Sequence, residues 1–367
     1  MAFAKNEIFF LFLFPILIII SCNSKPTGES KSFQDIPNGE GIEKYNKPST
    51  ILFEDNSILL ITLQFNIGSV SKDIQMERSN HPVNLIYEKE GKTISLNGKI
   101  KTRGNFRSSE YICNFPPYSL KFPESEADST IFKGAKKLKV VTHCINENSE
   151  NPQHLFQEYL VYKIYEQLTP KSFKVHLLKV KYEDVENKIP SFSSYAFLIE
   201  NDEKMALRNE SLLLEEIFME GDNNPDYQQS TLLSVFQFLI GNTDWFLPDH
   251  NMKVMVNQAG DTTAIPYDFD LSGMVNAPYA HQYHNFGMKN IRDRKFMGFC
   301  RNESEYKEVF NLFNNKKEEI LSLYRQFPHL NEDQKTASLD YIESFYTIIN
   351  SSDSVAKYMD RACGNTF

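Results

Sequence analysis

The chain has 367 residues, of which 41% are hydrophobic and 24% are charged, and its formal net charge is −9. This composition excludes a disordered chain, a coiled coil and a collagen-like fibre, and the length allows one large domain or two small ones. The excess of acidic residues argues against general nucleic-acid binding, which depends on basic surfaces.

The N-terminus has the pattern of a lipoprotein signal peptide. Lys5 precedes an apolar run at 8–20, which is short for a membrane-spanning helix and suits the core of a secretory signal. The run ends in Ser21-Cys22, so we expect residues 1–21 to be removed and Cys22 to carry a lipid. The alternative is an ordinary signal peptide with a chance cysteine. Residues 22–45 are polar and predict a flexible tether. Together these features predict a bacterial envelope protein, anchored to the membrane bilayer and facing the periplasm or the cell surface.

Four cysteines remain besides the lipidated one, an even number that favours disulfides in an exported chain. Three pairings are possible. We expect Cys113 to pair with Cys144, because these two flank a short strand-rich stretch. Cys300 would then pair with Cys363 and tie the last helix to the loop before it. The alternative is four buried free thiols.

Strands come first along the chain and helices come last. Before the first helix, hydrophobic patterns bounded by turn residues predict strands at 49–66, 82–88, 93–103, 117–122 and 136–143. Helices are predicted at 152–168, 227–240, 304–326 and 331–361. Between them lie two predicted strand pairs, 173–182 with 194–200 and 252–257 with 262–268. This order is that of an α+β protein and not of an alternating, doubly wound sheet.

Residues of the kind that support phosphoryl transfer concentrate at 241–273. Asp244 follows a predicted helix, Asn251 opens a predicted strand, and Asp268 ends the next strand, with Asp270 close behind. A β-hairpin would place Asn251 beside Asp268. Amide and carboxylate oxygens suit Mg²⁺ when phosphates and waters complete its shell, and an aspartate ahead of them can accept a hydroxyl proton. The same residue types are also common in turns.

Several segments between about residues 95 and 300 resemble, in their order, the CotH-kinase-like branch of atypical protein kinases. They are Thr-Arg-Gly-Asn at 102–105, Pro-Tyr-Ser-Leu-Lys-Phe at 117–122, Gln-Glu-Tyr at 157–159, Tyr-Ala-Phe-Leu-Ile-Glu at 195–200, Gly-Asn-Thr-Asp at 241–244, His-Asn at 250–251 and Pro-Tyr-Asp-Phe-Asp at 266–270. The resemblance implies a two-lobed protein-kinase-like fold, with a β-rich N-terminal lobe with one helix at 46–200 and a helical C-terminal lobe at 201–367. It also implies that ATP and Mg²⁺ or Mn²⁺ bind between the lobes.

The resemblance assigns roles to the polar residues at 241–273. Asp244 matches the catalytic aspartate. Asn251 and Asp268 match the metal ligands, and Asp270 could share that role. Asp249 is the alternative to Asn251, because the spacing after Asp244 is longer than in the catalytic loop of ordinary kinases.

The resemblance also implies a nucleotide site outside that segment. Lys121, on a predicted strand, would hold the phosphates and pair with Glu158 on the following helix. Glu158 lies in an apolar helical stripe, where a carboxylate needs a partner. Arg103, at a predicted strand end, is the rival phosphate contact, and Glu200 would lie near the nucleotide base. For Arg103, Glu158 and Glu200 the alternative is an ordinary turn or surface residue.

The sequence therefore predicts an exported, membrane-anchored kinase that transfers the γ-phosphate of ATP to a hydroxyl of a protein or glycan. Two alternatives stay open. One is a catalytically silent binding or scaffold lipoprotein, which the scarcity of ATP outside the cytoplasm favours. The other is a metal-dependent hydrolase that uses Asp244, His250, Asp268 and Asp270.

Overall fold

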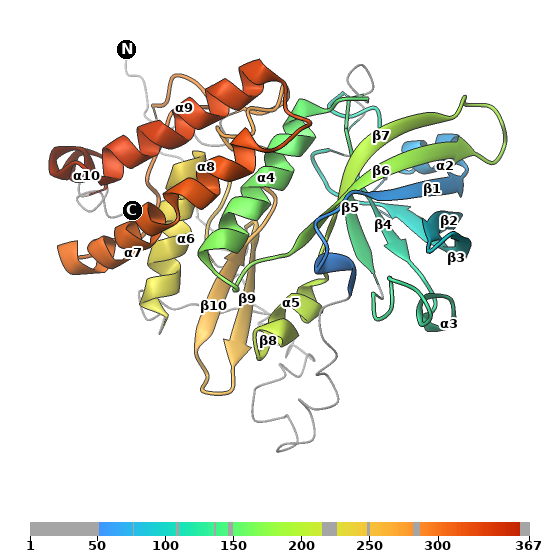
Figure 1. Ribbon diagram of the computed structural model, residues 1–367, viewed down its shortest axis with the longest axis horizontal. Helices are drawn as coiled ribbons and strands as arrows, with labels where there is room; N and C mark the ends of the chain where they lie inside the picture. Colours follow the sequence, from blue (N-terminus) through green and yellow to red (C-terminus); the bar gives the residue numbers. More distant parts are fainter. Residues whose placement is uncertain are drawn as a thin grey trace, which may run out of the picture.

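A computed structural model describes residues 51–359, apart from 76, 108, 110, 136, 146–149, 215–225, 248–249 and 282–286. The predicted signal peptide at 1–21, the lipid-bearing Cys22 and the tether at 22–45 lie outside these residues. The described part of the chain forms a β-barrel, a smaller sheet and a group of helices (Figure 1). None of its helices is long and apolar enough to cross a bilayer.

Seven strands close into a barrel in the order β1-β2-β3-β4-β5-β7-β6. Neighbouring strands are antiparallel except β1 and β6, whose parallel pairing closes the barrel. Alternate side chains, such as those of Leu63, Leu85 and Val180, fill its interior. The strands are β1 (Leu59–Phe65), β2 (His81–Lys89), β3 (Lys92–Thr102), β4 (Tyr118–Lys121), β5 (Leu138–Val141), β6 (Val175–Asp184) and β7 (Phe192–Ile199).

This closed barrel shows that the predicted two-lobed protein-kinase-like fold is wrong. Most predicted strands are present, but hydrophobic patterns show which segments form strands and not which distant segments pair. The closing contact joins residues far apart in the chain, such as Gln64 and Glu183, which are 119 positions apart. The predicted strand at 49–66 is also too long, because Ile51–Phe53 form the 3₁₀ helix η2 before β1 begins.

Helix α4 (Gln153–Leu168) lies between the barrel and the other long helices (Figure 1). It confirms the helix predicted at 152–168. The helix contacts β6 and β7 of the barrel on one side and α8 (Lys317–Arg325) on the other. Its side chains are buried on nearly every face, so it is a central core helix and not an amphipathic surface helix. This position carries Glu158 into the interior.

A second, three-stranded sheet follows the barrel in the chain. Its strands are β8 (Ser211–Leu214), β9 (Met252–Asn257) and β10 (Thr262–Pro266), with β9 in the centre. Helix α6 (Tyr227–Ile240) packs against β10 and confirms the helix predicted at 227–240. Gly241 ends α6 at a φ of +63°, and a Cβ there would clash with the Tyr341 hydroxyl. Only glycine fits this turn, which leads the chain directly into Asp244.

The two long helices predicted at the C-terminus are each broken in two. The first gives α7 (Glu303–Asn315) and α8, which meet at Lys316. The second gives α9 (Glu332–Ile349) and α10 (Ser352–Tyr358), where the side chain of Ser351 caps the new helix by accepting a bond from Ser354 N. The short helices are α2 (Ile67–Lys72), α3 (Glu124–Ala127) and α5 (Asp202–Arg208).

His154, near the start of α4, makes stability depend on pH. Its Nε2 lies 2.9 Å from the His143 carbonyl oxygen, and burial lowers its pKa from 6.5 to about 4. Because the folded pKa lies below the unfolded one, this histidine favours folding above pH 6.5, and the gain is lost as the pH falls towards 4. The loss amounts to about 3 kcal/mol.

We therefore expect His154→Gln to flatten the pH dependence of the unfolding free energy between pH 6.5 and 4, because glutamine carries no proton there and can still donate to the carbonyl. Urea denaturation at several pH values measures this. His281→Gln, at an exposed histidine, is the control and should leave the slope unchanged. An unchanged slope in His154→Gln would contradict the assignment.

Candidate functional site

The β9–β10 hairpin brings together two of the residues singled out from the sequence. Asn251 precedes β9 and Asp268 follows β10, and the Tyr267 amide donates to the Asn251 carbonyl at 3.1 Å. The predicted hairpin is confirmed. Both residues adopt a left-handed backbone, with φ of +56° at Asn251 and +63° at Asp268. The buried Tyr162 hydroxyl accepts a hydrogen bond from the Asp268 amide at 2.9 Å and so fixes this backbone.

Asp244 is held from two directions at the end of α6. His250 Nε2 lies 2.8 Å from its Oδ1, and Asn251 Nδ2 donates to its Oδ2 at 3.0 Å and to its carbonyl at 2.7 Å. The Asp244 amide donates to Asn242 Oδ1 at 2.9 Å. The ring of Phe246 stacks on His250 at 4.9 Å. Asp244 is thus positioned by contacts to both its oxygens, while each oxygen keeps a lone pair for a further proton.

Arg107 is the centre of the site, and sequence reasoning missed it. Its guanidinium binds Glu158 Oε2 at 3.1 Å, Asp268 Oδ1 at 2.8 Å and Asp270 Oδ2 at 3.1 Å. Arg107 is itself buried, as are Glu158 and Asp270. Five donors in a planar fork allow one arginine to bind three carboxylates at once. The only sign of a buried cation in the sequence was Glu158, because a carboxylate in the apolar stripe of a helix needs a partner.

The three carboxylates outnumber the one cation that binds them. Burial raises the pKa of Glu158, an effect that Arg107 partly offsets, and burial also raises the pKa of Asp270 well above its usual range against the opposing effect of Arg107. Burial alone would lower the pKa of Arg107, but Asp270 and Glu158 raise it well above its ordinary value. Glu158 Oε1 is buried and has no hydrogen-bond partner among the described residues. A proton on one of the carboxyls, or the neighbouring charge of Arg103, can therefore balance the cluster.

The predicted Lys121–Glu158 pair is wrong. Lys121 ends β4 on its exposed side, while Leu120 before it points into the barrel. Arg103 is the cation that interacts with Asp268 instead, and Lys139 lies near Arg103. Arg103 has a buried Nε without a hydrogen-bond partner in the described part of the chain, and burial lowers its pKa while Asp268 raises it. Lys139, on β5, lies 2.6 Å from Asp202 and 5.3 Å from the ring centre of Tyr267.

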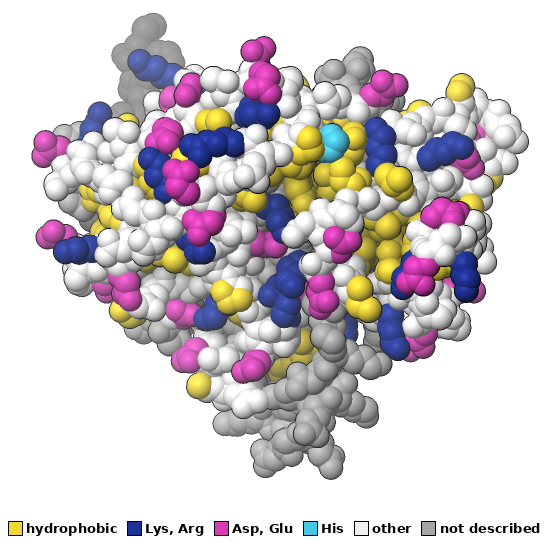
Figure 2. Space-filling view, in the orientation of Figure 1, with side chains coloured by type: hydrophobic (Ala, Val, Ile, Leu, Met, Phe, Trp, Pro, Cys, Tyr) yellow, Lys and Arg dark blue, Asp and Glu magenta, His cyan; other side chains and the backbone are white. Residues whose placement is uncertain are grey.

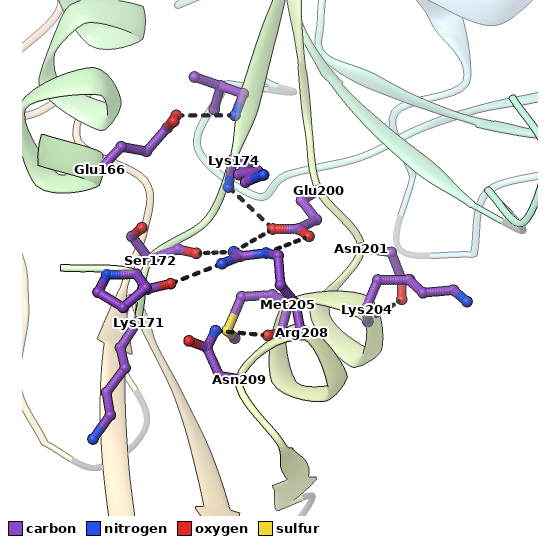
Figure 3. A network of polar contacts seen from close by, with 12 residues as sticks. Glu166, Lys171, Ser172, Lys174, Glu200, Asn201, Lys204, Met205, Arg208 and Asn209 are labelled. Atoms are coloured by element: carbon purple, nitrogen blue, oxygen red, sulfur yellow. Dashed lines mark hydrogen bonds and ion pairs between the residues drawn. The ribbon is translucent and has the colours of Figure 1, made fainter. Parts of the chain in front are cut away.

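Glu200 lies in a different network, at the end of β7 (Figure 3). Arg208 donates to both of its carboxylate oxygens, at 3.0 and 2.8 Å, and the Lys174 amide donates to Oε2 at 3.1 Å. Arg208 also donates to the Pro170 and Ser172 carbonyls. Glu200 is buried, and these bonds tie helix α5 to the barrel. Its place near a nucleotide base is therefore not supported, and its role here is structural.

No known protein-family model matches the chain, and no curated protein is significantly similar to it. The function must therefore be argued from the site itself.

A divalent cation would have two oxygen ligands here. Asp268 has one oxygen on Arg107, and its side chain is 38% exposed, so the other can face a ligand. Asn251 commits its amide nitrogen to Asp244, which leaves its carbonyl oxygen. No group of three or more His, Cys, Asp or Glu side chains in the described ranges is arranged to hold a metal. The alternative ligand Asp249 lies outside those ranges. Mg²⁺ or Mn²⁺ fits only if phosphates and waters supply the remaining ligands.

A disulfide fastens the loop that carries Arg107. Cys113 is bonded to Cys144, as predicted, and the Phe115 amide donates to the Cys144 carbonyl at 3.1 Å. The loop after β3 is thereby joined to the segment that leads from β5 towards α4. The second predicted pair involves Cys363, which lies outside the described residues. The confirmed disulfide therefore links the loop that carries Arg107 to the segment that leads to α4, the helix of Glu158.

Removing the positive charge from this cluster should be costly. We expect Arg107→Met to lower the free energy of unfolding by roughly 3–5 kcal/mol, because it leaves buried carboxylates without their counter-ion. The matched control is Arg325→Met, which removes an exposed pair with Glu318 and should change stability by less than about 1 kcal/mol. Urea denaturation of both variants measures the difference. Equal effects would show that the Arg107 contacts do not stabilise the fold.

The disulfide should matter for both stability and the site. Replacing Cys113 and Cys144 together by serine is expected to lower the unfolding free energy by about 3–4 kcal/mol, because a loop with a sequence separation of 31 is no longer closed in the unfolded chain. Denaturation with and without reductant measures this. Reductant should destabilise the wild-type protein by at least this amount more than the double variant, because in the variant it can open only a bond made by Cys300.

Proposed function

We propose that the protein is an exported, membrane-anchored phosphotransferase that transfers the γ-phosphate of ATP to a hydroxyl of a protein or glycan. The observation that carries the proposal is the juxtaposition of Asp244, Asn251 and Asp268 at one end of the hairpin. This places a positioned carboxylate beside two oxygen ligands of the kind that Mg²⁺ accepts. The resemblance of the motif order to CotH-kinase-like proteins supports these roles, independently of the fold.

Asp244 would act on the acceptor. One of its oxygens can take the proton of an acceptor hydroxyl, while His250 and Asn251 keep the carboxylate in place. His250 can also stabilise the negative charge of Asp244 before the proton arrives. The contribution of the protein is thus orientation and proton acceptance, which is most of what phosphoryl transfer requires from side chains.

The phosphates would lie beside Asp268, where cations from the barrel converge. Arg103 offers a buried nitrogen without a partner among the described residues, and its charge interacts with Asp268, so it would be the phosphate contact in place of the predicted Lys121. Asp268 and Asn251 would hold Mg²⁺ or Mn²⁺, which when bound would neutralise charge on the phosphates. Asp268 is the exposed carboxylate of the Arg107 cluster and so the one that could reach such a cation.

A second function is favoured by one specific observation. Arg107 already binds Glu158, Asp268 and Asp270, so this cluster is held together without a metal. A lipoprotein with such a permanently closed cluster would be a catalytically silent binding or scaffold module on the cell surface. It would fold and bind its partner without nucleotide.

Nucleotide binding separates the two functions. We expect ATP with Mg²⁺ or Mn²⁺, but not ATP alone, to raise the melting temperature of the purified protein, because a ligand at 100 times its Kd stabilises the folded state by about 2.7 kcal/mol. Asp268→Asn should abolish the metal-dependent shift. Asp244→Asn should keep the shift but lose phosphate transfer from labelled ATP. Asp340→Asn, at an exposed aspartate of α9, is the control and should behave as wild type. No shift with any nucleotide would favour the silent module.

A further inference from the structure

The outer face of strands β3 and β4 carries three lysines side by side. Lys99 and Lys121 lie directly opposite one another in the antiparallel pairing of these strands, and Lys101 lies two residues further along β3. Side chains alternate between the two faces of a strand, and the neighbours Ile100 and Leu120 are buried inside the barrel, so the lysines point outward. We call Lys99, Lys101 and Lys121 the lysine face.

The lysine face has no acidic contact. Its three side chains form no ion pair and no hydrogen bond in the part of the chain that the structure describes. Two glutamates follow Lys121 on α3 without pairing with it: Glu126 accepts a bond from the Asn97 amide at 3.0 Å, and Glu124 is exposed. Like charges directly opposite one another destabilise a sheet, so an anionic partner here would relieve a repulsion that the fold leaves in place.

The outer positions around the lysine face are uncharged. Asn97 precedes Lys99 by two residues on the same side of β3. Pro82 lies opposite Lys99 on β2, and Ser119 lies opposite Lys101 on β4. The positive charge of the face is therefore not interrupted by an acid at any of these positions.

A second pair of opposed lysines provides a comparison. Lys89 and Lys92 lie opposite each other at the end of the β2–β3 hairpin. Glu88 and Glu90 stand on either side of Lys89 in the chain, so acids lie next to this pair. The lysine face differs from it in having a third lysine and no acid at an adjacent position.

The dimensions of the lysine face suit an extended chain. The backbones of Lys99 and Lys101 are about 7 Å apart along β3, and those of Lys99 and Lys121 are about 5 Å apart across the strands. An extended peptide also presents the side chains of one face about every 7 Å, so acidic residues at alternate positions match the spacing along β3. All three cations are lysines, whereas arginine is the residue that favours bidentate phosphate contacts. A peptide that carries carboxylates therefore fits this face better than a phosphate polymer.

A flat anionic surface such as a bilayer fits less well. Recognition of anionic lipids takes clusters of about four to eight basic residues, and the lysine face has three. The chain has a formal net charge of −9, and Figure 2 shows acidic and basic side chains mixed over the visible face of the molecule. A narrow partner can avoid the acids that a bilayer would meet.

The lysine face leads towards the candidate site. The Arg103 amide donates to the Pro117 carbonyl at 2.9 Å, so the pairing of β3 with the segment before β4 continues beyond Thr102. Arg103 follows Lys101 by two residues, and its charge interacts with that of Asp268. A segment bound along β3 would therefore end beside the residues that form the candidate site.

We propose that the lysine face docks an acidic, extended segment of a partner protein. Carboxylates at alternate positions of the segment would pair with Lys99 and Lys101, and a neighbouring carboxylate would pair with Lys121. The proposal does not depend on phosphotransfer, because the phosphotransferase and the silent binding module both need a partner.

The test uses the purified full chain with Cys22→Ser, so that no attached lipid contributes. The probe is a fluorescein-labelled peptide with glutamate at alternate positions, and its fluorescence anisotropy should rise on saturable binding. Raising the salt concentration from about 20 mM to about 0.5 M should weaken this binding at least tenfold, because salt screens exposed charges. A peptide with the same glutamates in one consecutive run should bind at least threefold less well, because half of its carboxylates then point away from β3.

Charge-reversal variants locate the site. Lys99→Glu with Lys121→Glu should weaken the peptide at least tenfold, and Lys99→Gln with Lys121→Gln serves if that variant fails to fold. The matched control is Lys89→Glu with Lys92→Glu, which makes the same change of charge at the other opposed pair and should stay within twofold of wild type. No saturable binding by the wild type, an equal loss in both double variants, equal affinity for the two peptides, or preferential binding to phosphatidylglycerol vesicles would overturn the proposal.

Discussion

The arrangement of the site depends on one buried arginine. Arg107 stands in an irregular loop after the third barrel strand, and its three carboxylate partners come from α4 and from the segment after β10. The contact to Asp268 spans 161 positions of sequence. Without Arg107, the barrel, the central helix and the hairpin would still pack through apolar contacts, but the carboxylates would repel one another in a region of low dielectric. The guanidinium therefore fixes how the three carboxylates lie relative to one another.

The imbalance of charge in this cluster links structure to function. One arginine binds three carboxylates, and burial raises the pKa of Glu158 and of Asp270, so a proton taken up by the cluster relieves part of the imbalance. Asp268 is the most exposed of the three and so the one through which a solvent-borne cation would enter. Both functions considered above follow from this cluster. In the phosphotransferase, one carboxylate oxygen of Asp268 would bind a metal ion. In the silent module, Asp268 would bind only Arg107.

Local parts of the site could be predicted from the sequence, and distant contacts could not. Asn251 and Asp268 flank a short hairpin, so their spacing alone placed them side by side. The alternation of β4 would also have put Lys121 on the outer surface, because Leu120 must point inward to fill the barrel. Arg107, by contrast, lies in a segment without periodicity, and nothing local to it indicates burial. The closure of the barrel by β1 and β6 was missed for the same reason, since pairing between distant strands leaves no local pattern.

The confirmed disulfide explains how an irregular loop can hold such an arginine. Backbone bonds within the loop are few and short in range, such as that from the Cys113 amide to the Ser109 carbonyl. They cannot by themselves offset the conformational entropy of ordering the segment from Arg103 to Cys113. The bond from Cys113 to Cys144 restricts the unfolded chain instead and joins the loop to the segment between β5 and α4. Because disulfides persist mainly in oxidising compartments, the order of the Arg107 loop depends on the redox conditions around the protein.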